Sequence, residues 1–503
     1  MAKYLLGLDI GSSSIKAALI NSESGQAVAS AQSPSEEMPM LAKNPGWAEQ
    51  DPEMWWEHAV ISIKACIQKS GISGNDVAAI GISYQMHGLV VVGKDHKPLR
   101  PSIIWCDSRA VEIGEKAFAD LKADYCLSHF LNSPGNFTAS KLKWVKDNEP
   151  ELFSKIHKIM LPGDYIALKL SGEINTTDTG LSEGMFWDYK SGTVSKTLLD
   201  YYGIGSELIA DQVPVFSVQS QLRAETAKEV GLAAGIKIAY RAGDQPNNAF
   251  SLNVLNPGET AATAGTSGVI YSVTDKNAFD QKSRVNAFIH VNNGHEAKAV
   301  RNGVLLCVNG TGILNSWLRK NIKGNGSPYD YTEINTIASQ APIGSAGLTM
   351  LPFGNGAERI LENKEINSSF YGLNFNQHNQ SHIFRAAQEG IVFALKYGFE
   401  ILQSMGVQTS VIRAGHANMF LSPLFREAFV NTINAPLELY DTDGAKGAAI
   451  GAGVGAGIYS SFPEAFKGLK MIKSGNPVAD KAAQYDKAYL HWKKNLTNQL
   501  TNK

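Results

Sequence analysis

The chain has 503 residues, enough for roughly two to four domains with sizeable buried cores. Its 46 Lys and Arg residues nearly balance 47 Asp and Glu residues, so nothing in the formal net charge of −1 predicts a nucleic acid or an anionic membrane as a partner. Hydrophobic residues make up 44% and charged residues 18%, proportions that are typical of a globular protein.

Neither the cysteines nor the apolar segments point to export or to a membrane. The four cysteines are far apart and form no CxxC pair, so we expect reduced thiols. Asp9 interrupts the first apolar run too early for a signal peptide. The late apolar stretch 444–458 contains Lys446 and is too short to span a bilayer. We therefore expect a cytoplasmic protein with no membrane partner.

The chain begins with a pattern of strand, polar loop and strand. Residues 4–10 and 15–20 form two apolar runs around Gly11-Ser12-Ser13-Ser14, and residues 26–31 predict a third strand. Asp9 stands just before the loop, where its carboxylate suits Mg²⁺ held through water. The alternative is a strand-end residue satisfied by nearby backbone amides.

The next segment predicts a helix and then a strand that ends in a distinctive turn. Asp51-Pro52 supplies an N-cap and a first-turn proline for a helix through about Ser70. Residues 77–83 read as a strand that ends at Tyr84-Gln85-Met86-His87-Gly88. The following stretch 88–95 superficially resembles a Walker A motif, but its inner residues are apolar and Asp95 replaces the Ser or Thr, so no P-loop is predicted.

A third short strand, 102–105, ends in Cys106-Asp107-Ser108-Arg109. Because the ends of adjacent strands commonly place side chains in one α/β crevice, we expect Met86 and His87 to meet Trp105 and the residues that follow it over one pocket. The alternatives are a hydrogen-bonded core histidine and a packed core tryptophan.

The middle of the chain is expected to lead to a domain boundary. Residues 138–172 are mostly helical in pattern, and the polar segment 174–188 reads as a loop. Asn256-Pro257-Gly258 predicts a turn and a hinge. We therefore expect one lobe over residues 1–250 and a second over residues 251–503.

Residues 242–268 carry the strongest chemical signal. Asp244 precedes Gln245, Asn247 and Asn248, a cluster suited to a polyhydroxylated ligand. Gly265-Thr266-Ser267-Gly268 separates two apolar runs and predicts a hairpin whose backbone can approach an anion. A carboxylate and a phosphate-type loop so close together suggest an active site in which a base faces a phosphoryl group. The alternative is a helix cap followed by an ordinary tight hairpin.

The two hairpins, at residues 4–20 and 260–273, share the order of strand, Gly-Ser/Thr-Ser loop and strand. We interpret them as a weak internal repeat that opens each half of the chain. If they faced each other across a cleft, they would hold a polyphosphate from both sides.

The second half adds loops that could border such a cleft. A strand at 304–308 leads into Asn309-Gly310-Thr311-Gly312, and a strand at 410–414 ends at Gly415-His416-Ala417-Asn418. Residues 444–457 predict a helix so rich in Gly and Ala that its backbone must approach either a nucleotide base or a packed element closely.

Taken together, these motifs resemble the FGGY carbohydrate kinase family over roughly residues 4–460. The resemblance is carried by Gly7-Leu-Asp-Ile-Gly-Ser-Ser, Trp47-Ala-Glu-Gln-Asp-Pro52, Gln85-Met-His-Gly88, Pro134-Gly-Asn-Phe-Thr138, Leu161-Pro-Gly-Asp-Tyr165, Gly243-Asp244 and Gly265-Thr-Ser-Gly268. Within the family, Gln85-Met-His-Gly88 and the Trp105-x-Asp107-x-Arg109 pattern are similar to the motifs of xylulokinases.

The resemblance implies an α/β, two-lobed fold of the actin/sugar kinase/Hsp70 (ribonuclease H-like) class, with the active site in the interdomain cleft. It implies ATP-dependent phosphorylation of the terminal primary hydroxyl of a ketopentose, D-xylulose, with ATP and Mg²⁺ as cofactors and a homodimer as an expectation. Three positions depart from the pattern, namely Cys106, Gln245-Pro246 and the segment 414–418.

The implied site residues fall into four groups. Asp244 would be the general base, Asp9 the metal contact, and the sugar contacts would be Met86, His87, Trp105, Asp107 and Gln245. The implied nucleotide contacts are Gly11, Ser12, Ser13, Lys16, Gly265, Thr266, Ser267, Asn309, Gly415, His416 and Asn418.

Other functions remain open from the sequence. The sugar could be ribulose, L-xylulose or a polyol such as glycerol. An ATP-driven clamp like actin or an Hsp70-type chaperone would share the paired hairpins, and a catalytically inactive sugar sensor would share the fold. Asp244 among Gln and Asn residues favours a small polyol in the cleft, and the chain shows no basic patch for nucleic acid.

Overall fold

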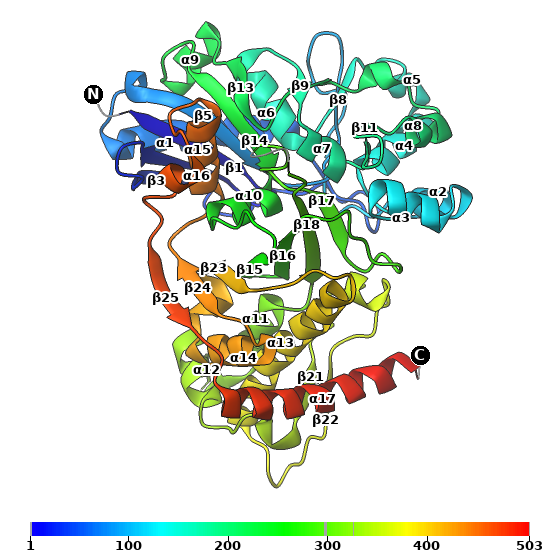
Figure 1. The fold of residues 1–503 in the computed structure, drawn as a ribbon, viewed down its shortest axis with the longest axis vertical. Coiled ribbons are helices and arrows are strands. Elements are labelled where there is room, and N and C mark those ends of the chain that lie inside the picture. The colour runs from blue at the N-terminus through cyan, green and yellow to red at the C-terminus, as the bar shows by residue number, and fades with distance from the viewer. Residues whose placement is uncertain (1–2, 296–298, 325, 502–503) are drawn as a thin grey trace.

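The computed structural model of the protein describes residues 3–295, 299–324 and 326–501. Two lobes, each built around a mixed β-sheet, lie one above the other along the long axis of the molecule (Figure 1). No helix in the described ranges is both long and apolar enough to cross a bilayer.

The N-terminal lobe is organised on a six-stranded sheet in the order β13-β14-β5-β1-β2-β3. The strands β1, β2 and β3 pair antiparallel with one another in chain order, whereas β5 pairs parallel with both β1 and β14. The strands are β1 (Tyr4–Ile10), β2 (Ile15–Asn21), β3 (Ala27–Ser33), β5 (Val77–Tyr84), β13 (Phe216–Gln221) and β14 (Lys237–Gly243). One face is covered by α1 (Pro52–Ser70), α6 (Pro162–Ser171) and α9 (Ala224–Val230).

Smaller elements complete this lobe (Figure 1). The short strands are β4 (Glu49–Gln50), β6 (Val90–Val92), β7 (Ser102–Ile103), β8 (Lys158–Met160), β9 (Asn175–Thr176), β10 (Trp187–Asp188), β11 (Thr193–Val194) and β12 (Asp211–Gln212). The helices are α2 (Val111–Asp120), α3 (Ala123–Phe130), α4 (Thr138–Asn148), α5 (Pro150–Phe153), α7 (Asp178–Glu183), α8 (Lys196–Tyr202) and α10 (Asp244–Ser251).

The C-terminal lobe repeats the plan with a seven-stranded sheet in the order β17-β18-β16-β15-β23-β24-β25. Its strands are β15 (Glu259–Ala264), β16 (Gly268–Thr274), β17 (Asn286–Ile289), β18 (Asn302–Val308), β23 (Val411–Gly415), β24 (Leu437–Tyr440) and β25 (Met471–Gly475). Its helices are α11 (Gly312–Asn321), α12 (Tyr331–Ala338), α13 (Gln380–Ser404), α14 (Pro423–Ile433) and α17 (Ala479–Thr501), and its short strands are β19 (Lys323–Gly324), β20 (Ser327–Pro328), β21 (Thr349–Leu351) and β22 (Ser369–Tyr371).

The two predicted hairpins are confirmed and occupy equivalent places. β1 pairs antiparallel with β2 and parallel with β5, just as β15 pairs antiparallel with β16 and parallel with β23. The predicted internal repeat is therefore a repeat of sheet topology. The two-lobed α/β fold implied by the family resemblance is the fold observed.

The helix α15 (Gly444–Gly455) crosses from the second half of the chain to the first lobe. Its alanines pack with Leu5, Ala79 and Tyr240 on the sheet face opposite α1 (Figure 1). The close approach requires glycine, because a Cβ on Gly7 would lie 1.8 Å from the carbonyl oxygen of Ala445. The short helix α16 (Phe462–Ala465) joins the same core. The expected division into 1–250 and 251–503 is thus corrected, since residues of the second segment complete the first lobe.

Two local expectations also differ from the structure. The strand β7 pairs with β4 in a separate two-stranded sheet and not beside β5, so it does not end at the edge of the main sheet. The segment 174–188, expected as a loop, contains β9, α7 and β10. Thr177 caps α7 by accepting a hydrogen bond from the amide of Gly180.

The packing of α15 predicts that Gly81→Ala destabilises the fold. A Cβ at Gly81 would lie 2.0 Å from the carbonyl oxygen of Ala448, and overpacking of this kind costs roughly 1–3 kcal/mol. Thermal unfolding followed by circular dichroism should show a lower Tm. The matched control is Gly475→Ala, where a Cβ would make an ordinary contact of 3.7 Å with Val430. Equal Tm values for the two variants would contradict the account of this packing.

Candidate functional site

Asp244 lies where β14 ends and α10 begins, between the two lobes. Helix α10 packs against α15 of the first lobe and against β15 and β16 of the second. Burial and the neighbouring Asp9 together raise the pKa of the Asp244 carboxyl to about 7, and hydrogen bonds from Gln245 oppose this shift. A carboxyl group with a pKa near neutrality is well matched to accept a proton from an alcohol.

Asp9 lies at the end of β1, where the sequence predicts a metal contact. Its Oδ1 accepts a 2.9 Å hydrogen bond from the Ser83 hydroxyl. Burial raises the pKa of Asp9, and the carboxylate of Asp443 adds to that effect, whereas Ser83 and Lys16 oppose it. A divalent cation would offset the negative charge of these carboxylates.

The residues around Asp9 fit a Mg²⁺ ion that is held by one carboxylate and otherwise by waters and substrate phosphates. In the described part of the chain, no three His, Cys, Asp or Glu side chains are grouped as a complete metal site. Mg²⁺ commonly binds through one or two carboxylates, waters and substrate phosphates. Asp9 would hold such an ion, which would supply positive charge near the phosphates.

The loop between β1 and β2 forms the first predicted phosphate site. It is closed by a hydrogen bond from the Gly11 amide to the carbonyl of Ser14. The carbonyl of Ser12 accepts from Gln50 and that of Ser13 from the amide of Met38, so surrounding segments fix the loop. Lys16 lies opposite Asp9 in the strand register. The structure thus brings Gly11, Ser12, Ser13 and Lys16 together beside Asp9.

The loop between β15 and β16 forms the second predicted phosphate site. The amides of Gly312 and Ile313, at the start of α11, donate to the carbonyls of Gly265 and Thr266. A Cβ on Gly312 would lie 2.2 Å from the Gly265 oxygen, so only glycine allows this approach. The loop and the N-terminus of α11 therefore form one rigid unit.

A cavity of about 600 Å³ opens beside this second loop. Its lining includes Gly265, Thr266 and Asn418 from the predicted nucleotide contacts, and Glu37 of the first lobe also reaches it. The helices α11 and α12 add Lys320, Tyr331 and Asn335, which the sequence did not single out. Its volume and its mixture of polar and aromatic groups suit a small ligand such as a nucleoside.

The remaining predicted nucleotide contacts of the second half of the chain, Ser267, Asn309, Gly415 and His416, do not line this cavity, and neither do those of the first loop. Asn309 donates through its side chain to Ala357 and through its amide to Glu358, so it holds the neighbouring loop. His416 is exposed and its amide donates to the carbonyl of Tyr440. Asn309 and His416 therefore stay predicted nucleotide contacts that lie outside the lining of this cavity.

The Met86-His87 turn, which holds two of the predicted sugar contacts, lies against Gly243, the residue before Asp244. A Cβ on Gly243, the residue before Asp244, would lie 2.6 Å from Cγ of Met86. The Nδ1 of His87 donates a 2.9 Å hydrogen bond to the carbonyl of Glu183, because a carbonyl can only accept. Burial lowers the pKa of His87 to about 3, so the ring is neutral and its Nε2 is an acceptor.

Lys141 of α4 joins this turn to the segment after β7. Its wholly buried ammonium group donates 2.9 Å hydrogen bonds to the carbonyls of His87 and Ile104. Burial lowers the pKa of Lys141 to about 7, and Asp107 opposes that shift. The predicted meeting of the two segments is therefore observed, although a lysine rather than a shared sheet edge produces it.

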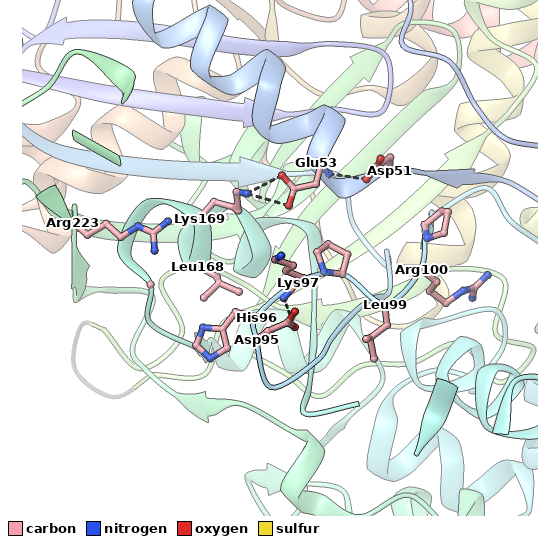
Figure 2. Close-up of a pocket in the computed structure, with 13 residues that line it drawn as sticks. Asp51, Glu53, Asp95, His96, Lys97, Leu99, Arg100, Leu168, Lys169 and Arg223 are labelled. Carbon is pink, nitrogen blue, oxygen red and sulfur yellow. Dashed lines mark hydrogen bonds and ion pairs between the residues drawn. The ribbon is translucent and has the colours of Figure 1, made fainter. Parts of the chain in front are cut away.

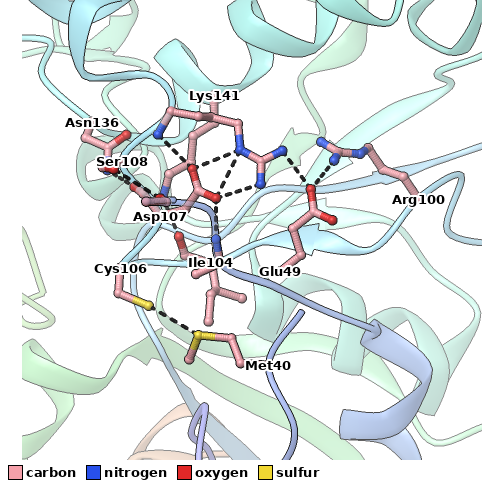
Figure 3. Close-up of polar contacts among 12 residues, drawn as sticks. Met40, Glu49, Arg100, Ile104, Cys106, Asp107, Ser108, Asn136 and Lys141 are labelled. Carbon is pink, nitrogen blue, oxygen red and sulfur yellow. Dashed lines mark hydrogen bonds and ion pairs between the residues drawn. The ribbon is translucent and has the colours of Figure 1, made fainter. Parts of the chain in front are cut away.

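Trp105 and Asp107 have different environments. The Trp105 ring is 52% exposed and donates a 3.3 Å hydrogen bond to Ser12 Oγ, so it borders the first phosphate loop. Asp107 is wholly buried and accepts from the Arg109 guanidinium and from the amide of Ala48 (Figure 3). Arg109 in turn lies 3.8 Å from the Trp47 ring. We therefore revise the expectation for Asp107, which supports this loop instead of facing a sugar.

A separate cavity of about 580 Å³ lies away from these residues, beside α1, α6 and residues 95–101 (Figure 2). None of the predicted site residues lines it. Lys169 in its wall is paired with Glu53 at 2.7 Å, and the lining carries four Lys and Arg side chains against three Asp and Glu side chains. This cavity has no evident part in the chemistry at Asp244.

Comparisons with known proteins agree with this geometry. Residues 4–251 match the N-terminal domain of the FGGY family of carbohydrate kinases. Xylulose kinase of Bacillus subtilis is 29% identical over 421 residues, 82% of this chain and 81% of the relative. L-xylulose/3-keto-L-gulonate kinase of Escherichia coli is 28% identical over 93% of this chain and 92% of the relative. The crystal structure of ligand-bound xylulose kinase from Lactobacillus acidophilus matches with a TM-score of 0.89 at 26% identity, covering 99% of this chain and 98% of that one.

The burial of Asp244 predicts a pH-dependent gain in stability for Asp244→Asn. Because its pKa is raised to about 7 in the folded protein, ionisation opposes folding as pH rises from about 4 to 7, and the full cost remains above pH 7. The variant should therefore have a higher Tm than the parent chain at pH 8 and a smaller advantage at pH 5. Scanning calorimetry without ligands measures both. A lower Tm for Asp244→Asn at pH 8 would contradict this electrostatic account.

Proposed function

Because the chain belongs to the FGGY family of carbohydrate kinases, we propose that it transfers the γ-phosphoryl group of ATP to the terminal primary hydroxyl of D-xylulose. The product would be D-xylulose 5-phosphate. The observation that carries the proposal is the position of Asp244, a partly buried carboxyl group with a pKa of about 7 beside both Asp9 and the Met86-His87 turn.

Asp244 is proposed as the general base. Phosphoryl transfer to an alcohol needs an in-line hydroxyl, a group that takes its proton, and positive charge around the phosphoryl oxygens. Asp244 would accept the proton at its carboxylate as the hydroxyl oxygen attacks. The loops at Gly11–Ser13 and Gly265–Ser267 would orient the phosphates through backbone donors.

The sugar is proposed to bind between Asp244 and the Met86-His87 turn. The neutral His87 would accept a hydrogen bond from a sugar hydroxyl at Nε2, and Met86 would provide an apolar wall. Gln245, next to the base, would contribute further polar contacts. The half-exposed Trp105 ring would cover the sugar from the side of the first phosphate loop.

ATP is proposed to span the cleft, with its base in the cavity at Gly265, Thr266 and Asn418. Mg²⁺ would be held by Asp9 and would supply charge that offsets the phosphates. Glu37 reaches the cavity from the opposite lobe, which supports closure of the lobes around bound nucleotide. Closure about residues 251–258 would exclude water and limit ATP hydrolysis without sugar.

A second candidate substrate is L-xylulose, because the E. coli relative named for that sugar is as similar in sequence as the xylulose kinases. Ribulose and glycerol remain further candidates from the motif departures at Cys106 and Gln245. The preference of a kinase among these sugars depends on a few hydrogen bonds to the sugar hydroxyls.

Sugar-dependent ADP release from MgATP tests the proposal. We expect kcat/KM for D-xylulose to exceed the values for L-xylulose, D-ribulose, L-ribulose and glycerol by at least roughly tenfold, because each mismatched hydroxyl leaves a polar group unpaired. A preference for another sugar would overturn the substrate but not the kinase activity. Release that no sugar stimulates would contradict the proposed function.

A further inference from the structure

Glu183 is a buried acid for which the proposed reaction has no role. It ends α7, its side chain is 1% exposed, and its carboxyl oxygens make no hydrogen bond of good geometry among the described residues, although the Tyr84 hydroxyl and the His87 amide lie near them. Burial of a polar group without partners is costly, and such groups are rare unless they serve a purpose.

The carboxyl group of Glu183 lies next to His87, a proposed sugar contact, and next to Gly243. Its Oε2 is 3.9 Å from Nδ1 of His87. A Cβ on Gly243 would lie 2.9 Å from the same oxygen, so the carboxyl group also touches the backbone that leads into Asp244. One side chain therefore contacts both the sugar-binding turn and the strand end that carries the base.

The surroundings of Glu183 favour the neutral acid. Burial raises the pKa of Glu183 well above its usual range, and the carboxylates of Asp244 and Asp164 add to this, whereas the Tyr84 hydroxyl opposes it. Lys141 is the cationic group on the same side, and Glu183 raises its pKa slightly against the effect of burial. When Asp244 is ionised, Glu183 can therefore remain protonated and leave His87 uncharged.

The orientation of the His87 ring is set by its backbone conformation and by the residues that contact the ring. His87 has a left-handed backbone with φ of 61°, which is uncommon for a residue with a side chain. Its ring contacts Phe137 and Phe288 at centroid distances of 4.9 and 5.3 Å. Nδ1 is bound to the Glu183 carbonyl, and Nε2 has no partner among the described residues.

We propose that Glu183 is a positioning residue for the sugar: its carboxyl group fills the space behind His87 and Gly243 and holds the imidazole with Nε2 towards the bound sugar. The inference rests on the proposed function, because it takes His87 as a sugar contact. Glu183 itself does not touch the sugar, so its effect is transmitted through His87.

Steady-state kinetics of Glu183→Ala and Glu183→Gln, with the best sugar of the panel, test this role. Glu183→Ala leaves space behind the ring and should raise the sugar KM at least roughly tenfold, with the KM for ATP unchanged. Glu183→Gln keeps the shape of the neutral acid and should stay within about threefold of the parent KM. The matched control is Asp178→Asn, which changes the other acid of α7, a partly exposed residue, and should leave the sugar KM unchanged.

A double-mutant cycle separates positioning from a general loss of structure. If Glu183 acts through His87, the combination of His87→Ala and Glu183→Ala should have the sugar KM of His87→Ala alone. The inference would be overturned if the two substitutions multiplied their effects on the sugar KM in the double variant. It would also be overturned if Glu183→Ala left the sugar KM unchanged, or raised the KM values for sugar and ATP equally. Each of these outcomes would leave the kinase proposal intact. A parent chain that releases no ADP with any sugar would overturn the proposed function and this inference together.

Discussion

The arrangement of this molecule depends on placing the Asp244 carboxyl group, which is only partly exposed, at the junction of two lobes. Helix α10, which begins with this residue, is enclosed by α15 on one side and by the β15–β16 hairpin on the other. Burial and the nearby charge of Asp9 make the ionised form of Asp244 costly, which is the reason that its pKa is about 7. The same surroundings that oppose charge on Asp244 therefore give it the pKa that its proposed role as a general base requires near neutral pH.

The enclosure of Asp244 requires close backbone packing. Helix α15 can approach β1 and β5 because Gly7 and Gly81 have no side chains, and Gly447 of the helix faces Asn247 and Ser251 of α10. Asn247 donates to the carbonyl of Gly444, which ties the two helices together. The Gly and Ala composition of α15 thus allows the close packing that encloses α10.

The sequence predicted the parts of the fold that depend on local pattern. The hairpins and α1 with its Asp51 cap follow from turn residues and capping. The crossing of α15 could not be predicted, because small residues indicate a close approach but not its partner. Asp107 was wrongly predicted to contact the sugar, and Glu183 was not singled out at all, because the contacts of both residues depend on the folded structure. Asp107 is held by Arg109, an ion pair formed within one loop, and Glu183 lies in a polar segment that has the composition of a loop.

The most direct test of the central claim is the pH dependence of kcat/KM for the sugar at saturating MgATP. Our account predicts a rate that rises tenfold per pH unit on the acid side and levels off near pH 7, where the Asp244 carboxyl loses its proton. Asp244→Asn should lack this limb and retain a rate lower by roughly 10²–10⁴. A profile that is flat from pH 5 to 8, or an Asp244→Asn variant with near-normal turnover, would contradict the assignment of Asp244 as the base.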